Sequence, residues 1–272
     1  MVPTSQSRPQ RPNRYGLQPS NQKIFSAKQS GRELSGVLRK TQSLIMELDT
    51  SIECVLFDLD GTLIDTALDF IKALGRLTAE NNQPPVKDLR VQQTVSDGAR
   101  ALIKLAFDIT ENDDRFASLN QRLLDLYLEQ LEDTEATLYP GLSYLLTQLE
   151  KVGIPWGIVT NKPEKYSHQL LDKLNLLTRC GVLVCPDHVS ERKPHPEPIF
   201  LACDRLSCST ERTVYLGDHI RDIQAAKNAD VIAVAAAYGY LSPEVKVEEW
   251  FADFILRSSE QALPLLNSLK FA

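Results

Sequence analysis

Residues 54–65 read CVLFDLDGTLID, an apolar run that ends abruptly in two carboxylates, Asp58 and Asp60. The run over 55–57 predicts a buried strand of a parallel sheet, apolar on both faces. Gly61 allows a sharp backbone turn after that strand, at the edge where open α/β sheets bind ligands. Two ionised carboxylates so close together need a cation, a shared proton or both, and oxygen ligands suit magnesium.

The composition favours a globular protein that works in solution. The 272 residues suffice for one large or two smaller domains, and 43% hydrophobic and 24% charged residues are ordinary values. A net charge of −6 argues against nucleic acid or an anionic membrane as partner. No apolar run approaches the roughly 18 residues that a membrane span needs. Five cysteines without a C-x-x-C pair predict reduced thiols and a cytoplasmic location, not a disulfide framework or zinc site.

Positive charge is concentrated at the N-terminus. Residues 1–45 carry eight Lys or Arg and one acidic residue, Glu33. Because residues 1–48 are also rich in Ser, Gln and Pro and poor in apolar residues, we expect a disordered basic extension. Three other interpretations stay open: a transit peptide, a weak basic contact arm, and a mis-assigned start upstream of Met46.

A helical block follows the first strand and spans residues 66–138. Apolar residues recur there at helical spacing in three segments, 67–80, 98–107 and 116–131, and no strand is expected. A helical insert between the first strand and the rest of an α/β core indicates a cap. Its hinges would be Asp65-Thr66 and Tyr139-Pro140-Gly141.

The rest of the chain alternates strands and helices. Strands are predicted over 155–160, 182–185, 213–216, 231–235 and 254–256, and helices over 141–152, 166–174, from about 198, 223–228 and 259–269. This alternation predicts an α/β core with a doubly wound, Rossmann-like parallel sheet. The core would comprise residues 49–65 and 139–272, and the all-helical cap would be inserted between them.

Polar groups stand at four strand ends or neighbouring loops, where the carboxyl edge of the sheet would gather them. They are Asp58 with Asp60, Thr160 with Asn161, Lys193, and Asp218 with Asp222. In this order and approximate spacing they resemble the four motifs of the haloacid dehalogenase superfamily, and the string DLDGT over 58–62 resembles its phosphatases in particular. The resemblance covers essentially residues 54–272 and is broadly to the phosphoglycolate phosphatase family.

The resemblance implies a phosphomonoester hydrolase that works through an aspartyl-phosphate. Asp58 is the expected nucleophile. Asp60 is the expected general acid and base, which protonates the leaving alkoxide and then deprotonates water. Lys193 would supply positive charge to the phosphate and to Asp58, and Thr160 and Asn161 would bind the phosphoryl oxygens.

The resemblance also implies a magnesium ion. Asp58, the main-chain carbonyl of Asp60, and Asp218 would be its protein ligands, and Asp222 would act more remotely or through water. The ion would offset the repulsion between these acids and the phosphate and polarise the phosphoryl oxygens.

The expected substrate is a small phosphorylated metabolite. The strings WGIVTNKP over 156–163, CPDHV over 185–189 and SDGARA over 96–101 resemble a branch that acts on N-acetylmuramic acid 6-phosphate in cell-wall recycling. Arg100 could contact a substrate carboxylate, which both muramic acid and phosphoglycolate carry. N-acetylmuramic acid 6-phosphate is therefore favoured, closely followed by 2-phosphoglycolate.

Two other functions stay open: a phosphosugar mutase, which shares the motifs and the helical cap, and a non-catalytic binding or regulatory protein that kept the fold. His195 stands where the family commonly has Asp, and neither its role nor that of His219 is defined by the sequence. A monomer or a weak homodimer is expected.

Overall fold

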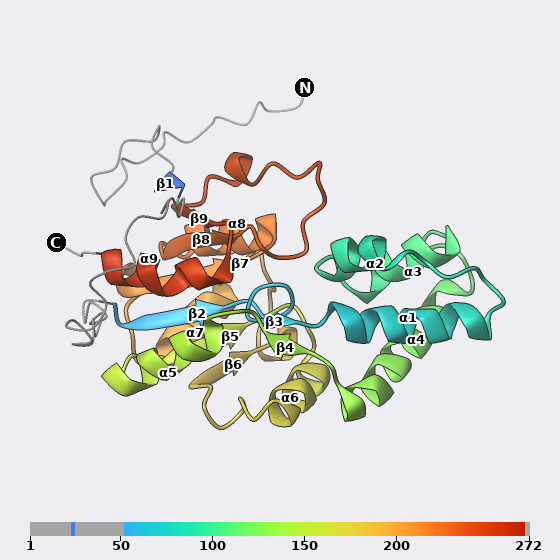
Figure 1. The fold of residues 1–272 in the computed structure, drawn as a ribbon, viewed down its shortest axis with the longest axis horizontal. Coiled ribbons are helices and arrows are strands. Elements are labelled where there is room, and N and C mark those ends of the chain that lie inside the picture. Colours follow the sequence, from blue (N-terminus) through green and yellow to red (C-terminus); the bar gives the residue numbers. More distant parts are fainter. Residues whose placement is uncertain (1–22, 25–51, 270–272) are drawn as a thin grey trace, which may run out of the picture.

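The strand β2 (Cys54–Phe57) lies in the middle of a parallel sheet (Figure 1). The structure is a computed structural model that describes residues 23–24 and 52–269. Within these residues, seven strands form one sheet in the order β1-β9-β8-β7-β2-β5-β6, and every neighbouring pair is parallel. The predicted doubly wound α/β core is thereby confirmed.

The other strands of this sheet are β1 (Lys23–Ile24), β5 (Trp156–Val159), β6 (Val182–Val184), β7 (Thr213–Gly217), β8 (Ile232–Ala236) and β9 (Phe254–Leu256). Leu56 of β2 pairs with Tyr215 of β7 on one side and with Gly157 of β5 on the other. The chain therefore builds the sheet outward from β2 in both directions. Ligands of open α/β sheets bind in the crevice at such a switch point.

Most of the N-terminal extension lies outside the described residues. Lys23 and Ile24 pair with Phe254 and Ile255 of β9, at the edge of the sheet. The remaining expectations for residues 1–48, including the disordered extension, the transit peptide, the contact arm and the alternative start at Met46, fall on residues that the structure does not describe.

Two helical layers cover the sheet (Figure 1). The helices of the core are α5 (Leu142–Val152), α6 (Glu164–Lys173), α7 (Glu197–Leu206), α8 (Ile220–Asn228) and α9 (Ala262–Ser268). Val55 and Phe57 of β2 belong to one apolar cluster, with residues of α5, α6 and α9. Cys54 and Leu56 belong to the other, with residues of α7 and α8. Because successive strand residues point to opposite faces, the continuous apolar run of β2 serves both layers.

Short 3-10 turns connect several of these elements: η1 (Leu131–Asp133), η2 (Pro186–His188), η3 (Thr210–Arg212), η4 (Val247–Trp250) and η5 (Ser259–Gln261).

Among the described helices, none has the length and apolar composition that crossing a membrane requires.

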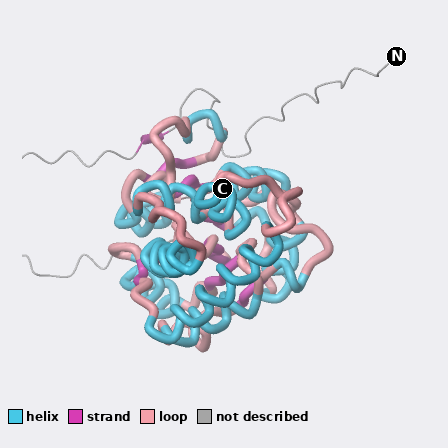
Figure 2. The backbone as a smooth tube through the Cα atoms, turned by 90° about the vertical axis from the view of Figure 1, so that its right-hand side faces the viewer, coloured by secondary structure: helices cyan, strands magenta, loops and turns pink. Residues whose placement is uncertain are grey.

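Four helices form a separate group beyond the carboxyl ends of the strands, here called the helical insert (Figure 1). They are α1 (Ala67–Glu80), α2 (Asp88–Val95), α3 (Ala99–Phe107) and α4 (Phe116–Gln130). Figure 2 looks at the molecule from the side of this insert, with the magenta strands of the core enclosed among cyan helices. The helix α2 was not expected, because only Val91 and Val95 are buried in it and its apolar pattern is correspondingly thin.

The chain enters and leaves the insert through a small antiparallel ribbon. Its strands are β3 (Ile64–Asp65) and β4 (Thr137–Leu138), and Ile64 pairs with Leu138. The prediction of no strand in residues 66–138 was therefore wrong for Thr137–Leu138. Two-residue strands carry too little periodicity to be read from sequence, and this pairing exists because the tertiary fold brings both crossings together.

Candidate active site

Asp58 directly follows β2 and is held by main-chain contacts. Its N–H donates to the carbonyl of Leu216 at 2.8 Å, and its Oδ1 accepts the N–H of Leu59 at 2.8 Å. Gly61 then turns the chain with φ +76°, and a Cβ at this position would overlap the carboxylate of Asp218. The glycine is thus required by both its backbone conformation and its close approach to the acidic group.

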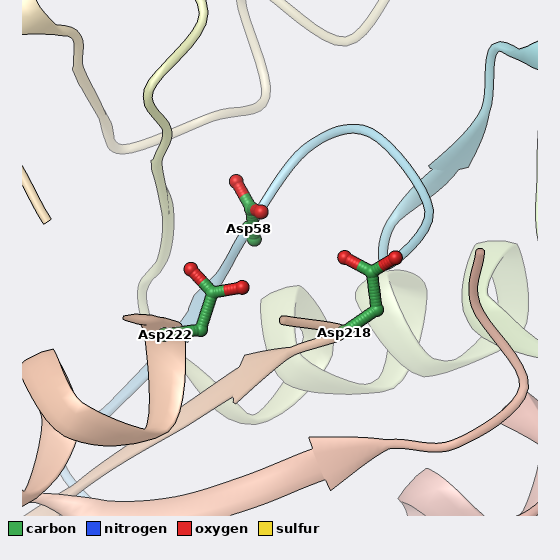
Figure 3. Close-up of side chains that lie close together, drawn as sticks. All are labelled: Asp58, Asp218 and Asp222. Carbon is green, nitrogen blue, oxygen red and sulfur yellow. The ribbon is translucent and has the colours of Figure 1, made fainter. Parts of the chain in front are cut away.

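Three carboxylates meet at the carboxyl edge of the sheet (Figure 3). Asp58 follows β2, Asp218 follows β7, and Asp222 lies in the first turn of α8. All three are buried, and one carboxylate oxygen from each lies within 4.8 Å of the others. The predicted convergence of these residues is therefore present in the structure.

Burial of these carboxyl groups so close together shifts their pKa values. Burial, together with the carboxylates of Asp58 and Asp222, raises the pKa of Asp218 to about 7. Burial opposes the ionised form of Asp58 as well, but the charge and hydrogen bond of Lys193 outweigh it and hold the pKa of Asp58 below its usual value. The contact with Lys193 thus favours the ionised form of Asp58.

Lys193 is a buried cation beside the acidic cluster. Its Nζ lies 2.9 Å from Oδ1 of Asp58 and 2.8 Å from Oδ1 of Asp222, and its side chain has no exposed surface. The ammonium also donates to the carbonyl of Val159 and to the hydroxyl of Tyr215, each at 2.8 Å. Such a fully surrounded ammonium acts as a fixed point charge between the two acids.

Tyr215 is a site residue that the sequence did not reveal. It lies in the middle of β7 and is fully buried, where sequence reasoning assigns an apolar core role. Its hydroxyl accepts from Lys193 and donates to the carbonyl of Val159 at 2.9 Å. Burial, with Asp222 and Asp58 nearby, raises its pKa well above the ordinary value, so the phenol stays protonated and can continue to donate.

Asp222 has a structural task in addition to its pairing with Lys193. Its Oδ2 accepts the N–H of His219 at 3.0 Å, and Nδ1 of His219 accepts the N–H of Arg221 at 3.2 Å. These reciprocal bonds form the N-terminal cap of α8. His219 is therefore a helix-capping residue, which answers one of the questions that the sequence left open.

The three carboxylates fit a divalent metal ion. Within the described part of the chain, Lys193 bonds Asp58 and Asp222, and no cation is bonded to Asp218, whose pKa is raised. A cluster of buried carboxylate oxygens with unbalanced negative charge is the donor set that a hard cation such as Mg²⁺ prefers.

Thr160 and Asn161 lie beside these acids, at the end of β5. Thr160 is buried, and its Oγ1 accepts the N–H of Lys162 at 3.1 Å, which leaves its own proton available to another acceptor. The side-chain amide of Asn161 donates to the carbonyl of Lys193 at 3.0 Å. Asn161 thereby positions the main chain of Lys193, a role that sequence reasoning did not anticipate.

Asp60 lies on the side of the site that faces the helical insert. Its Oδ1 accepts from the hydroxyl of Thr66 at 2.5 Å and pairs with Nζ of Lys162 at 2.8 Å. Lys162 and Thr66 were not predicted as site residues. The position of Lys162, directly after Thr160-Asn161, was the one available signal.

The helical insert also contacts the loop that carries Asp218. In the segment between α2 and α3, Ser96 donates to Oδ2 of Asp218 at 2.8 Å, and Arg221 donates to the carbonyl of Ser96. Asp97 lies 3.1 Å from Nε2 of His219. The string over 96–101 had been singled out for its resemblance, but its contact with the acidic cluster becomes visible only in three dimensions.

Arg100 and His195 lie apart from this cluster in their described contacts. Arg100 is exposed, pairs with Glu111, and lies 5.0 Å above the ring of Phe116, all within the insert. Its contact with substrate therefore stays a prediction. His195 is exposed and accepts the N–H of Glu197 at 3.2 Å.

The sheet topology and the acidic cluster define a hydrolase of one family. The family model of haloacid dehalogenase-like hydrolases matches residues 55–236, and the chain belongs to this family.

Similar proteins place the chain among the phosphatases of the family. It is 39% identical over 216 residues to the N-acetylmuramic acid 6-phosphate phosphatase of Pseudomonas aeruginosa, covering 79% of this chain and 95% of that protein. It is 37% identical over 210 residues to the phosphoglycolate phosphatase of Xanthomonas campestris, covering 76% and 93%. The crystal structure of a predicted phosphoglycolate phosphatase from Haemophilus somnus superposes with a TM-score of 0.71 at 26% identity, covering 80% of this chain and 99% of that one.

Proposed function

We propose that the protein is a magnesium-dependent phosphomonoester hydrolase that acts on N-acetylmuramic acid 6-phosphate through an aspartyl-phosphate intermediate. The observation that carries the proposal is the carboxylate of Asp58, paired with Lys193 and adjacent to Asp218 and Asp222 at the edge of the sheet. Oδ1 of Asp58 is occupied by Lys193 and by the N–H of Leu59, and Oδ2 has no protein partner among the described contacts. Oδ2 is therefore the oxygen available for attack.

In the first step, Oδ2 of Asp58 forms a bond to phosphorus, and the bond from phosphorus to the ester oxygen breaks. Asp60 gives its proton to the leaving oxygen, so the alcohol departs neutral and Asp60 becomes a carboxylate. Lys193 stays beside Asp58 and offsets part of the charge on the phosphoryl group, while the free proton of Thr160 is available to a phosphoryl oxygen.

In the second step, Asp60 takes a proton from a water molecule, and the water oxygen forms a bond to phosphorus. The bond between phosphorus and Asp58 breaks, which releases inorganic phosphate and restores the Asp58 carboxylate. Asp60 ends in the protonated form from which it began. The two half-reactions thus use the same pair of carboxylates in turn.

Asp58, Asp218 and the main-chain carbonyl of Asp60 would hold Mg²⁺, with Asp222 nearby. When bound, the ion would neutralise charge at the phosphoryl group and polarise its oxygens. The acidic donor set and the raised pKa of Asp218 support this assignment.

The helical insert would serve as a cap that encloses the substrate. Its residues Ser96 and Asp97 contact Asp218 and His219, so this segment lies where a substrate on Asp58 would be covered. Arg100 belongs to the same part of the insert and is proposed to bind a substrate carboxylate.

The five cysteines are all free, which supports a cytoplasmic location, where thiols stay reduced.

The choice of substrate rests on similarity. Two relatives that act on N-acetylmuramic acid 6-phosphate, from Pseudomonas aeruginosa and Pseudomonas putida, are 39% and 38% identical to this chain, and the phosphoglycolate phosphatase of Xanthomonas campestris is 37% identical. These differences are small, so the substrate must be tested directly.

The test measures phosphate release from N-acetylmuramic acid 6-phosphate, 2-phosphoglycolate, several hexose phosphates and p-nitrophenyl phosphate, with and without Mg²⁺. We expect the highest kcat/KM on N-acetylmuramic acid 6-phosphate, no turnover in a chelator, and a loss of more than about 1000-fold in Asp58→Asn, because the nucleophile is gone. Equal background release from wild type and Asp58→Asn would contradict a phosphatase. Comparable rates on every substrate would contradict the narrow assignment.

A further inference from the structure

Lys162 carries a buried charge that the motifs do not account for. It lies in the loop between β5 and α6, its side chain is 6% exposed, and its Nζ contacts Oδ1 of Asp60 at 2.8 Å. The same ammonium donates to the hydroxyl of Tyr127, on α4 of the insert, at 2.7 Å. One side chain of the core thus joins the proposed acid and base to the helical insert.

The insert supplies an aromatic pocket for this ammonium. The rings of Phe70 on α1 and Tyr127 on α4 stack with centroids 4.0 Å apart and planes 9° apart. Nζ of Lys162 lies 4.9 Å from the centroid of the Phe70 ring and 4.4 Å from that of Tyr127. A desolvated ammonium is tolerated here because the Tyr127 hydroxyl and the Asp60 carboxylate replace the water that it has lost, while the two stacked rings beside it exclude solvent.

These contacts determine how Asp60 can be used. Its Oδ1 accepts from both Thr66 and Lys162, at 2.5 and 2.8 Å, so two donors hold one oxygen in place. With Oδ1 engaged in this way, the other oxygen is the one that can exchange a proton with the leaving group or with water. Once the proton has left, the charge on Asp60 is already paired with the ammonium of Lys162.

We infer that Lys162 is a positioning residue that orients Asp60 for proton transfer and makes this orientation depend on the docked helical insert. The dependence arises because the hydroxyl and both aromatic rings beside the ammonium belong to α1 and α4, whereas Asp60 belongs to the core. Without the insert, the ammonium would lose these partners and return to water. The inference rests on the proposed phosphatase function and adds a residue and a coupling to it.

The experiment compares two leaving groups in the first turnover. The p-nitrophenolate of p-nitrophenyl phosphate can depart without a proton, whereas the alkoxide of an alkyl phosphate needs one. The alkyl substrate is the sugar phosphate or phosphoglycolate of the panel above on which wild type has the highest kcat/KM. The variants are Lys162→Met, which removes the charge and retains similar length, and Tyr127→Phe, which removes the hydroxyl and retains the stacked ring.

In Lys162→Met we expect release of the alcohol in the first turnover to fall about 100-fold, the size of a typical general-acid contribution. Release of p-nitrophenolate in the first turnover should fall less than about fivefold, because this step needs no proton from Asp60. The following hydrolysis of the aspartyl-phosphate still needs Asp60 as base. The variant should therefore show a burst of p-nitrophenolate, equal to the enzyme concentration, before slow turnover.

Tyr127→Phe should show the same preference for p-nitrophenyl phosphate with a smaller loss, about 10- to 20-fold on the alkyl substrate, the lower end of the range for one lost hydrogen bond to a charged group. Added to Lys162→Met, it should cause no further loss, because the hydroxyl acts through the lysine. The matched control is Lys173→Met. Lys173 also joins the core to the segment after α4, through Glu132 at 2.8 Å, but it is partly exposed, and its variant should stay within about twofold of wild type.

If wild type hydrolyses both substrates and Lys162→Met loses the same factor on both, or loses nothing, the inference is wrong and the phosphatase proposal stands. If wild type hydrolyses neither, the phosphatase proposal fails, and this inference fails with it. Should Lys162→Met not fold, Tyr127→Phe decides the matter: an equal effect on the two leaving groups overturns the inference.

Discussion

Ser96 donates a 2.8 Å hydrogen bond from its Oγ to Oδ2 of Asp218, although 122 residues separate the two in the chain. Ser96 belongs to the helical insert, and Asp218 belongs to the acidic cluster of the core. Arg221 donates to the carbonyl of Ser96, and Asp97 contacts His219 at 3.1 Å. The position of the insert is therefore stabilised directly at Asp218, a residue proposed to bind the metal, and at the neighbouring start of α8.

Removing this bond should weaken the enclosure of substrate more than the chemistry. In Ser96→Ala, we expect KM to rise about 3- to 10-fold and kcat to change less, because the variant loses one hydrogen bond to a carboxylate. Steady-state kinetics on the best substrate measures both constants. Ser118→Ala is the control, because Ser118 bonds the carbonyl of Arg115 at the exposed start of α4. An unchanged KM in Ser96→Ala would show that this contact does not help to hold substrate.

Gly61 is predicted to tolerate no side chain. A Cβ there would overlap the carboxylate of Asp218, and the backbone has φ +76°, which L-residues adopt only at a cost. Gly61→Ala should therefore lower the free energy of unfolding by about 1–3 kcal/mol and abolish most activity.

Chemical denaturation and phosphate release measure the two effects of Gly61→Ala. Gly75→Ala is the matched control, because Gly75 lies within α1 and a Cβ there meets nothing within 4 Å. This variant should be unchanged or more stable by about 0.5–1 kcal/mol, since alanine is the better helix former. Equal stability of the two variants would contradict the close approach of Gly61 to Asp218.

Magnesium should stabilise the folded protein by relieving the repulsion within the acidic cluster. The free energy of unfolding of wild type, measured by thermal unfolding, should be about 2.7 kcal/mol higher with Mg²⁺ at 100 times its Kd than in a chelator. Asp218→Asn removes one of the three buried carboxyl groups and retains the shape of the side chain. The variant should be at least as stable as wild type without metal and should lose most of its response to Mg²⁺. A wild-type midpoint that does not move with millimolar Mg²⁺ would contradict the metal site.

Lys193 should be essential for folding as well as for activity. Lys193→Met leaves the carboxylates of Asp58 and Asp222 buried without their cation, and breaking such a pair costs about 3–5 kcal/mol. Adding Asp222→Asn should restore part of the stability but no activity. Lys72→Met is the control, because the pair of Lys72 with Glu135 is exposed and should contribute about 1 kcal/mol or less. A loss in Lys193→Met no larger than in this control would contradict the buried cluster.

The positions of the acidic residues could be predicted because they depend on local and topological rules. Asp58 follows an apolar strand, and Asp218 follows another, so the parallel sheet must bring both to the same edge. Lys193 was predicted from the resemblance of the four motifs to those of the haloacid dehalogenase superfamily. None of these inferences required knowledge of how the helical insert packs.

Other features had no such local signal. Lys162 and Tyr215 look like an exposed loop lysine and a core tyrosine, and each becomes a site residue only through partners distant in the chain. The helix α2 buries two side chains, and β4 contains two residues, so neither produces a clear periodic pattern.

The amino-acid order alone was sufficient for the parallel core, the helical insert, and the acidic residues at the strand ends, because alternating apolar segments and strand-end carboxylates are encoded by near neighbours. The folded arrangement alone shows that Ser96 meets Asp218, that Lys162 meets Asp60 and Tyr127, and that Arg100 pairs with Glu111. Each of these contacts joins segments whose distance and orientation follow from packing. No local pattern of residues encodes that packing.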